Sequence, residues 1–227
     1  MPVGRSPGER AHAGAAAKKI RRTTRRDEIV EAAERVFASR PFIKVSMRDI
    51  AKEAGISPAL IYRHFADQQH LFLEAFLRGA KKLVERLEAR LDESCTNPLE
   101  EASEVFISFL SENEHYFKMM THFMLEGTVH DALLERLNAI ERTVLDRFDS
   151  LFRACGAKGD VRLLSHCFFA ALNGVLITFR RHPGRSSEEV SRHMHRLART
   201  MASLFLHAIQ DTEATRRPPS APWGSAW

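Results

Sequence analysis

The 227-residue sequence predicts an all-α fold, and three observations predict it. Apolar residues recur every three or four positions, as at Ile29, Ala33, Val36 and Phe37, which places them on one face of a helix. No convincing stretch alternates apolar with polar residues as a half-buried β-strand does. Glycines and a His-Pro-Gly stop at 182–184 mark most of the gaps between the helical stretches.

The periodicity predicts nine helices, separated by short breaks. Their expected ranges are 24–39, 47–54, 58–65, 68–93, 98–112, 114–125, 131–154, 160–181 and 187–211. Several starts are well marked. Thr24 with Asp27, and Ser46 with Asp49, have the spacing of a capping box. Two further starts, 57–58 and 97–98, pair an N-cap residue with proline at the first helical position.

The positive charge of the chain is concentrated at its beginning. The net charge is +5, but residues 1–26 alone hold eight basic residues and one acidic residue. The remaining 201 residues have a net charge of −2. We expect a basic disordered arm over 1–23, which suits contact with a polyanion if its neighbour reads nucleic acid. The alternative is a tail that only increases solubility. The proline-rich stretch 212–227 is expected to be a second disordered tail.

Other classes of protein are disfavoured by composition. The three cysteines, Cys95, Cys155 and Cys167, are widely spaced and odd in number, which predicts neither a disulfide framework nor a zinc site. The longest apolar run, 167–179, falls short of the roughly 20 residues of a membrane span. The beginning of the chain lacks the apolar stretch of a secretory signal. We therefore expect a cytoplasmic protein with no membrane partner.

The most informative stretch, Ser46–Phe65, predicts a helix-turn-helix. Gly55 can adopt the left-handed conformation that ends the first helix, and Ser57 caps the second. Ala51 is small enough for the two helices to cross closely, while Ile50, Ala54, Ile56, Ile61 and Phe65 supply the apolar contact. The other side of the second helix, with Pro58, Ala59, Tyr62, Arg63 and His64, is free to enter a major groove. The alternative is an αα-hairpin with a solvated polar face.

Four segments together resemble the N-terminal domain of the TetR/AcrR transcriptional regulators. They are Arg25–Ala38, Pro41-Phe42, Ser46–Phe65 and Leu71–Phe76. The resemblance implies a helix-turn-helix DNA-binding domain over 24–67 and an all-α ligand-binding and dimerisation domain over 68–211. It also implies that DNA is contacted by Ser46, Arg48, Ser57, Pro58, Ala59, Tyr62, Arg63 and His64. Two positions depart from the family pattern. Pro41 replaces a glycine, and Gln68 replaces a lysine whose phosphate contact would become an amide contact or be lost.

The last predicted helix has apolar residues at steps of four and three, the spacing of a helix-pairing seam. These are Val190, Met194, Leu197, Met201, Leu204 and Ala208. The preceding helix is apolar nearly all round. We predict that both helices meet their symmetry mates in a four-helix homodimer interface that matches a palindromic double-stranded DNA operator. The alternative for the seam is core packing in a monomer.

A group of aromatic and methionine residues in the fifth to eighth helices is the candidate ligand pocket. It comprises Phe106, Phe109, Tyr116, Phe117, Met120, Phe123, Met124, Phe168 and Leu172. Such side chains can line an adaptable cavity for a small apolar molecule, although each of them can equally be core. His115 or His122 is a possible polar contact, but an exposed or singly bonded imidazole is the preferred interpretation.

These features predict a ligand-responsive transcriptional repressor with no cofactor, no metal and no catalytic residue. A helical-bundle metal-carboxylate enzyme is the alternative that Glu112-x-x-His115 raises, but a di-iron site requires a second such motif on a neighbouring helix, and the predicted helices contain none. A protein-interaction module with a basic tail is the other alternative. In the expected mechanism, the ligand moves the fourth helix, which joins sensor to reader, and shifts the population away from the DNA-binding state.

Overall fold

The structure, a computed structural model, describes residues 24–91, 95–126 and 131–211, and the regular structure within these ranges is entirely helical. The all-α prediction is confirmed. The helices are α1 (Arg25–Ser39), η2 (Phe42–Lys44), α2 (Met47–Glu53), α3 (Pro58–Tyr62), α4 (Gln68–Arg90), α5 (Pro98–Glu112), α6 (Glu114–Glu126), α7 (Asp131–Ala154), α8 (Val161–Phe179) and α9 (Ser187–Asp211). The expected arm over 1–23 and tail over 212–227 lie outside the described residues.

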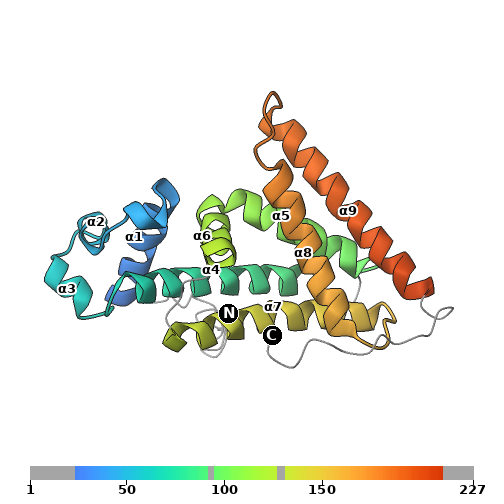
Figure 1. Cartoon of the computed structure of the whole chain (residues 1–227), viewed down its shortest axis with the longest axis horizontal. Helices are drawn as coiled ribbons and strands as arrows, with labels where there is room; N and C mark the ends of the chain where they lie inside the picture. Colours follow the sequence, from blue (N-terminus) through green and yellow to red (C-terminus); the bar gives the residue numbers. More distant parts are fainter. Residues whose placement is uncertain (1–23, 92–94, 127–130, 212–227) are drawn as a thin grey trace, which may run out of the picture.

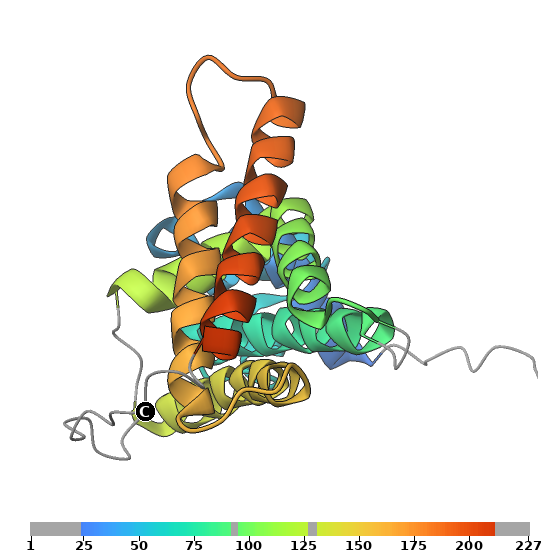
Figure 2. The same ribbon diagram turned by 90° about the vertical axis from the view of Figure 1, so that its right-hand side faces the viewer.

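The helices form two groups that share α4. Helices α1, α2 and α3 cluster at one end of α4, and α5 to α9 pack along and beyond the rest of it (Figure 1). Helix α7 runs beside α4, and α8 and α9 stand side by side at the end opposite α3 (Figure 2). We name the first group, residues 24–67, the reading head, and the second, residues 68–211, the sensor domain, after the roles that the sequence predicts for them.

The predicted helix starts are present as hydrogen bonds. In the first capping box the Thr24 hydroxyl accepts from the Asp27 amide at 3.2 Å, and the Asp27 carboxylate accepts from the Thr24 amide at 3.0 Å. Ser46 and Asp49 repeat this arrangement at the start of α2. Ser57 caps α3 and Asn97 caps α5, each followed by proline. Short polar side chains before each helix therefore fix where it begins.

Two features differ most from the sequence prediction, besides shifts of a few residues at the ends of other helices. The third helix was expected to reach residue 65, but α3 ends at Tyr62 because the amides of Arg63 and His64 bond three residues back, to Leu60 and Ile61. This tighter turn closes the helix early. The 3-10 turn η2 was not predicted. It follows Pro41, and it carries the Phe42 ring under the end of α1, where it lies 5.9 Å from the Phe37 ring.

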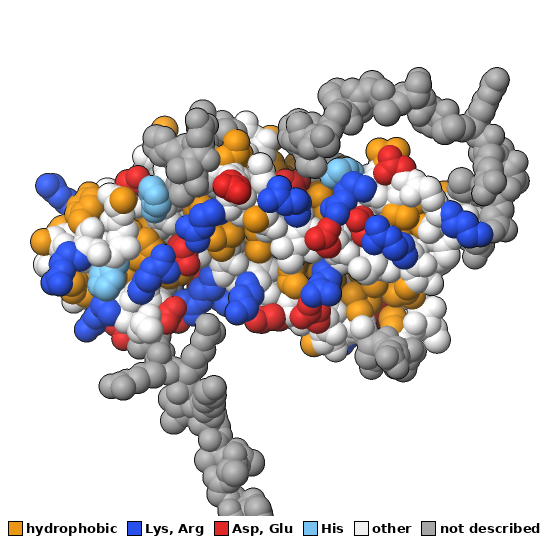
Figure 3. Space-filling model, turned by 90° about the horizontal axis from the view of Figure 1, so that it is seen from below, with side chains coloured by type: hydrophobic (Ala, Val, Ile, Leu, Met, Phe, Trp, Pro, Cys, Tyr) orange, Lys and Arg blue, Asp and Glu red, His pale blue; other side chains and the backbone are white. Residues whose placement is uncertain are grey.

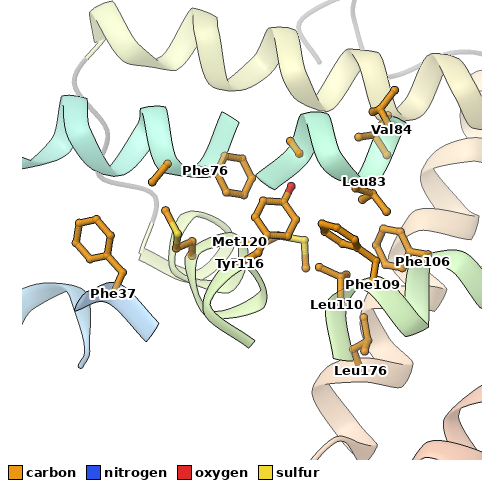
Figure 4. Close-up of a cluster of buried hydrophobic side chains, with 14 of the residues drawn as sticks. Phe37, Phe76, Leu83, Val84, Phe106, Phe109, Leu110, Tyr116, Met120 and Leu176 are labelled. Carbon is orange, nitrogen blue, oxygen red and sulfur yellow. The ribbon is translucent and has the colours of Figure 1, made fainter. Parts of the chain in front are cut away.

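A single apolar core runs through both groups of helices. Figure 4 shows Phe37 of α1, Phe76 of α4, Tyr116 of α6 and Phe109 of α5 directed into this core. At the far end the Phe168 ring makes edge contacts with Phe148 and Phe152, all fully buried. The reading head and the sensor domain therefore share one hydrophobic core and are not separate units joined only by a linker.

Helix α8 is strongly apolar in composition. With 19 residues and a mean hydropathy of 1.5, it is long and apolar enough to cross a membrane by length and composition alone. Core helices of soluble proteins meet the same criterion, and α8 packs against α5, α7 and α9. The apolar segment thus begins before residue 167, and 39% of it is buried inside the structure.

Helices α4 and α6 approach most closely at Gly79. A Cβ atom at this position would lie 2.3 Å from Cδ2 of Tyr116 and 2.8 Å from Cε2. The Tyr116 ring also stacks on Phe76 with 5.0 Å between ring centroids. The absence of a side chain at Gly79 is what lets the ring lie against the α4 backbone.

Substituting Gly79→Ala tests this contact. Helix propensity alone would stabilise the protein by about 1 kcal/mol, but overpacking a filled core costs about 1 to 3 kcal/mol. We expect a net loss in the free energy of unfolding, measured by urea denaturation at fixed protein concentration. In a Tyr116→Leu background the same substitution should cost less. A G79A variant as stable as the wild type would contradict the close packing.

Candidate nucleic-acid interface

The inner face of α3 is docked firmly on α2. Ile61 on α3 and Ile50 and Ala51 on α2 are completely buried, and Phe65, just after α3, is 3% exposed. Ala54 and Ile56 are half-buried beside them. Burying these side chains fixes which side of α3 faces inward, because a five-residue helix cannot turn without exposing Ile61. The predicted apolar contact of the helix-turn-helix is therefore present.

The turn between α2 and α3 has the geometry that its sequence predicts. Gly55 adopts a φ of +64°, in the left-handed region. The Ile56 amide donates to the Ala51 carbonyl at 3.0 Å and the Gly55 amide to the Lys52 carbonyl at 3.2 Å. This is the hydrogen-bond pattern of a Schellman motif, which ends α2 and redirects the chain into the Ser57 cap.

The outer face of α3 is open to solvent. Ser57, Pro58, Ala59 and Arg63 are exposed, and Tyr62 is 55% exposed despite its large ring. His64, which follows α3, is half-buried. Lys and Arg side chains lie at this end of the molecule, on the left of Figure 3, and continue along the rest of that face. The surface therefore combines a protruding phenol with positive charge, which suits phosphate and base-edge contacts.

The start of α2 contributes the other two predicted contact residues, Ser46 and Arg48, both exposed. The Ser46 hydroxyl donates to the Asp49 carboxylate at 2.6 Å while accepting from the Asp49 amide, so its proton is used inside the capping box. The hydrogen bonds from Ser46 lower the pKa of Asp49. Arg48 is exposed, and within the described part of the chain no hydrogen bond or ion pair holds its side chain.

Gln68, the position where the family pattern has lysine, is used inside the protein. Its side-chain amide donates to the carbonyl of Phe42 at 3.0 Å. The bond ties η2 to the start of α4. The amide therefore contributes to the shape of the reading head, which the sequence did not indicate.

The end of α1 is held by α6 of the sensor domain. Lys118 Nζ donates to the carbonyl of Ala38 at 3.0 Å, a favourable place for a cation at a helix C-terminus. The His122 ring lies 4.6 Å from the Phe42 ring and 5.3 Å from the Phe72 ring. His122, a possible ligand contact from sequence, thus sits at the junction with the reading head.

His115 lies in a different environment. It lines an open groove of about 370 Å³ together with Glu34 and Lys82, between α1, α4 and α6. Burial lowers the pKa of His115. Neither histidine is therefore placed among the fully buried aromatic side chains of the sensor domain.

The start of α1 is held by charge. The Glu74 carboxylate on α4 pairs with Arg26 of α1 at 2.9 Å and with Arg136 of α7 at 3.0 Å. The hydrogen bond from Arg26 lowers the pKa of Glu74 in spite of partial burial. The Arg26 guanidinium lies over the Phe65 ring at 4.7 Å. These partners are far apart in sequence, so no local pattern could have indicated them.

The candidate pocket residues fall into three groups in the structure. Phe106, Phe168 and Leu172 are completely buried, and Phe109, Tyr116 and Met120 are 5% exposed or less. Phe117 and Phe123 are half-buried, Phe117 under the Arg180 guanidinium and Phe123 against Phe72 and Phe76. Met124 is 45% exposed. The structure thus places six of the nine in the interior, two at its edge and Met124 outside it.

The residues of the predicted helix-pairing seam of α9 also differ in burial. Val190 and Met194 are buried within the chain itself, on the side of α9 that packs on α5 and α8. Leu197 and Met201 are half-buried, while Leu204 is 57% exposed and Ala208 is exposed. Only the C-terminal part of the seam therefore faces outward.

Helix α8 carries an exposed stripe that sequence reasoning missed. Leu163, Cys167, Ala170, Gly174 and Ile177 are exposed and follow one another at steps of four and three. The sequence alone does not distinguish this stripe from the buried side of α8, because many of the neighbouring positions are apolar as well. Small residues at its centre permit close approach of another helix.

The Glu112-x-x-His115 motif does not form a metal site of the kind that a helical-bundle enzyme requires. Glu112 is paired with Arg86 at 2.5 Å, and that hydrogen bond lowers the pKa of Glu112. Among the described residues, no group of three or more possible metal ligands comes together.

Comparison with known proteins agrees with this geometry. A family profile described as "Bacterial regulatory proteins, tetR family" matches residues 29–75. The activator FasR of Mycolicibacterium smegmatis is 28% identical over 117 residues, which is 50% of this chain and 53% of that protein. The repressor KstR2 of Mycobacterium tuberculosis is 32% identical over 104 residues, 46% of this chain and 52% of that protein.

The fold is similar over a longer range. The structure of the fatty acid degradation regulator FadR from Bacillus halodurans has a TM-score of 0.62 at 19% identity, covering 80% of this chain and 94% of that one. The chain spans about half the length of the curated relatives it matches. By their names, these two relatives are a transcriptional activator and a transcriptional repressor. The N-terminal motif and the curated relatives support a transcriptional regulator of the TetR family, and the helical architecture agrees with this in fold.

Proposed function

We propose that the chain is a ligand-responsive transcriptional repressor that binds a palindromic DNA operator as a homodimer and acts in the cytoplasm. The observation that carries the proposal is the division of α3 into a buried inner face and an open outer face. Ile61 anchors the helix, while Tyr62 and Arg63 project from it. A helix held this way can enter a major groove without rearranging its support.

Each predicted contact residue has a role in this proposal. Tyr62 and His64 form hydrogen bonds to phosphate oxygens. Ser46 and Ser57, the N-caps of α2 and α3, orient the N-terminal ends of these helices toward the DNA backbone. Arg48 reaches a base edge, and Pro58, Ala59 and Arg63 face the groove. The excess positive charge of residues 1–26 adds affinity that is independent of sequence and falls with salt.

Dimerisation supplies the second half-site. The exposed stripe of α8 and the outward residues of α9, Leu204 and Ala208, are apolar side chains of the kind that pair with a copy of themselves. Half-buried Leu197 and Met201 lie at its margin. Val190 and Met194, in contrast, support α9 from inside the chain. Two reading heads brought together by this surface match a two-fold symmetric operator.

The ligand of the proposed switch is a small apolar molecule, such as an acyl chain, a sterol-like ring or an aromatic compound. The interior that would accept it contains Phe109, Tyr116 and Met120, packed on Phe76 and Gly79 of α4. Displacing these side chains would move α4, on which the reading head is built. This supports a population shift between a binding and a released state.

Substitutions in the reading head should separate positioning from base recognition. Tyr62→Ala should weaken binding to all duplexes, and Arg48→Ala should reduce discrimination at one base pair by about 1 to 3 kcal/mol. The measurement is fluorescence anisotropy with a duplex selected from a random pool by the wild-type protein. Arg142→Ala, an exposed arginine of α7, is the matched control. Equal affinity of all variants would contradict the proposed interface.

A charge on the α8 stripe should dissociate the dimer. Ile177 is 55% exposed and lies on the stripe, so Ile177→Arg would place a cation in the apolar interface. We expect the wild type to sediment as a dimer at micromolar concentration and I177R as a monomer. Leu125→Arg, at a 78% exposed position of α6, should leave the dimer intact. A wild-type monomer, or a dimeric I177R, would overturn this part of the proposal.

Ligand responsiveness is tested by DNA affinity in the presence of a fatty acid, a sterol or a planar aromatic dye that raises the melting temperature of the protein. A coupling free energy of about 1 to 3 kcal/mol corresponds to roughly 5- to 150-fold weaker DNA binding at saturation. Titration with salt in the same assay distinguishes a DNA-binding regulator from a protein-interaction module with a basic tail. The affinity of the regulator for DNA should fall steeply with salt and retain a sequence preference, whereas the module would show no sequence preference. If saturated and free protein bind the selected duplex equally, the switch does not operate.

A further inference from the structure

Glu74 connects three helices through its two carboxylate oxygens. Oε1 pairs with Arg26 of α1 at 2.9 Å, and Oε2 pairs with Arg136 of α7 at 3.0 Å. The Glu74 side chain is 23% exposed, whereas the Arg26 and Arg136 side chains are 47% and 45% exposed, so the carboxylate is the least hydrated of the three groups. Because each carboxylate oxygen pairs with a different arginine, Glu74 joins α1 and α7 at the same time.

Arg26 extends this connection to the recognition helix. Its guanidinium stacks over the Phe65 ring at 4.7 Å, and the Phe65 amide donates to the Ile61 carbonyl at 3.0 Å. Ile61 is the buried anchor of α3. A continuous set of contacts therefore runs from α7 through Glu74, Arg26 and Phe65 to α3.

We propose that Arg136, a residue of the sensor domain, is a positioning residue for DNA binding and acts on α3 through Glu74, Arg26 and Phe65. This inference rests on the proposed DNA-binding function and adds α7 to the elements that set the angle of the reading head. The expected mechanism from sequence assigned that role to the fourth helix alone. Within residues 24–91, 95–126 and 131–211, Arg136 pairs with Glu74 and with no residue of α1 to α3, so its effect on DNA binding would be indirect.

The same two sensor helices provide a matched control. Arg147 of α7 pairs with Glu88 of α4, so this ion pair joins the helices in the same way as Arg136 and Glu74. Arg147 is 48% exposed and Arg136 is 45% exposed. Within the part of the chain that the structure describes, neither Arg147 nor Glu88 pairs with a residue of the reading head. Loss of the Arg147 pair removes an α4–α7 contact without interrupting the path to α3.

The experiment compares Arg136→Gln with Arg147→Gln in the full chain, using anisotropy with the duplex selected by the wild type. An exposed ion pair supports an effect of up to about fivefold, so we expect R136Q to bind roughly two- to fivefold more weakly and R147Q to bind like the wild type. Amide hydrogen exchange over 57–65 should be faster in R136Q only. Both variants should unfold at the same temperature. Arg136→Lys should restore part of the affinity.

Three outcomes separate this inference from the proposed function. If the wild type binds and Tyr62→Ala does not, but R136Q and R147Q both equal the wild type, the positioning role of Arg136 is wrong and the DNA-binding function stands. If R136Q and R147Q weaken binding equally, α4–α7 packing is the cause and the path through Glu74 is wrong. If the wild type selects no duplex, the proposed function itself fails.

Discussion

The burial of one face of α3 is the constraint on which the other features depend. Ile61 and Phe65 pack on Ile50 and Ala51 and leave almost no surface exposed. Because α3 has only five residues, this contact and not helix propensity holds it in place. The outer face is then available for nucleic acid, and the Schellman turn at Gly55 sets its direction. Without this contact, Tyr62 and Arg63 would have no fixed geometry to present.

The reading head is held by the sensor domain at both ends of α1. Lys118 and His122 contact its C-terminal end and the following turn, and Glu74 contacts its N-terminal end through Arg26. Between these points Phe37, Phe72 and Phe76 continue the core of the sensor domain into the reading head. A change of packing around Tyr116 can therefore reach α1 at both of its ends, and in the proposed dimer such a change would alter the spacing of the two reading heads.

Local sequence signals predicted the parts of the structure that are set locally. The caps at Thr24, Ser46, Ser57 and Asn97, and the left-handed Gly55, each depend on residues within three positions, and all are present. Periodicity predicted the long helices. It could not separate the inward from the outward side of α8, where nearly every position is apolar, so the stripe from Leu163 to Ile177 became visible only in three dimensions. The ion-pair partners of Glu74, Arg26 and Arg136, lie 48 and 62 residues away in sequence, so no local pattern predicts these pairs.

The central claim is that the outer face of α3 enters DNA grooves, two copies at a time. Hydroxyl-radical footprinting of the wild-type protein on a selected duplex tests it most directly. Our account predicts two protected patches related by a two-fold axis, with centres about 10 base pairs apart or at a multiple of that spacing. A single patch, or uniform protection along the duplex, would contradict it.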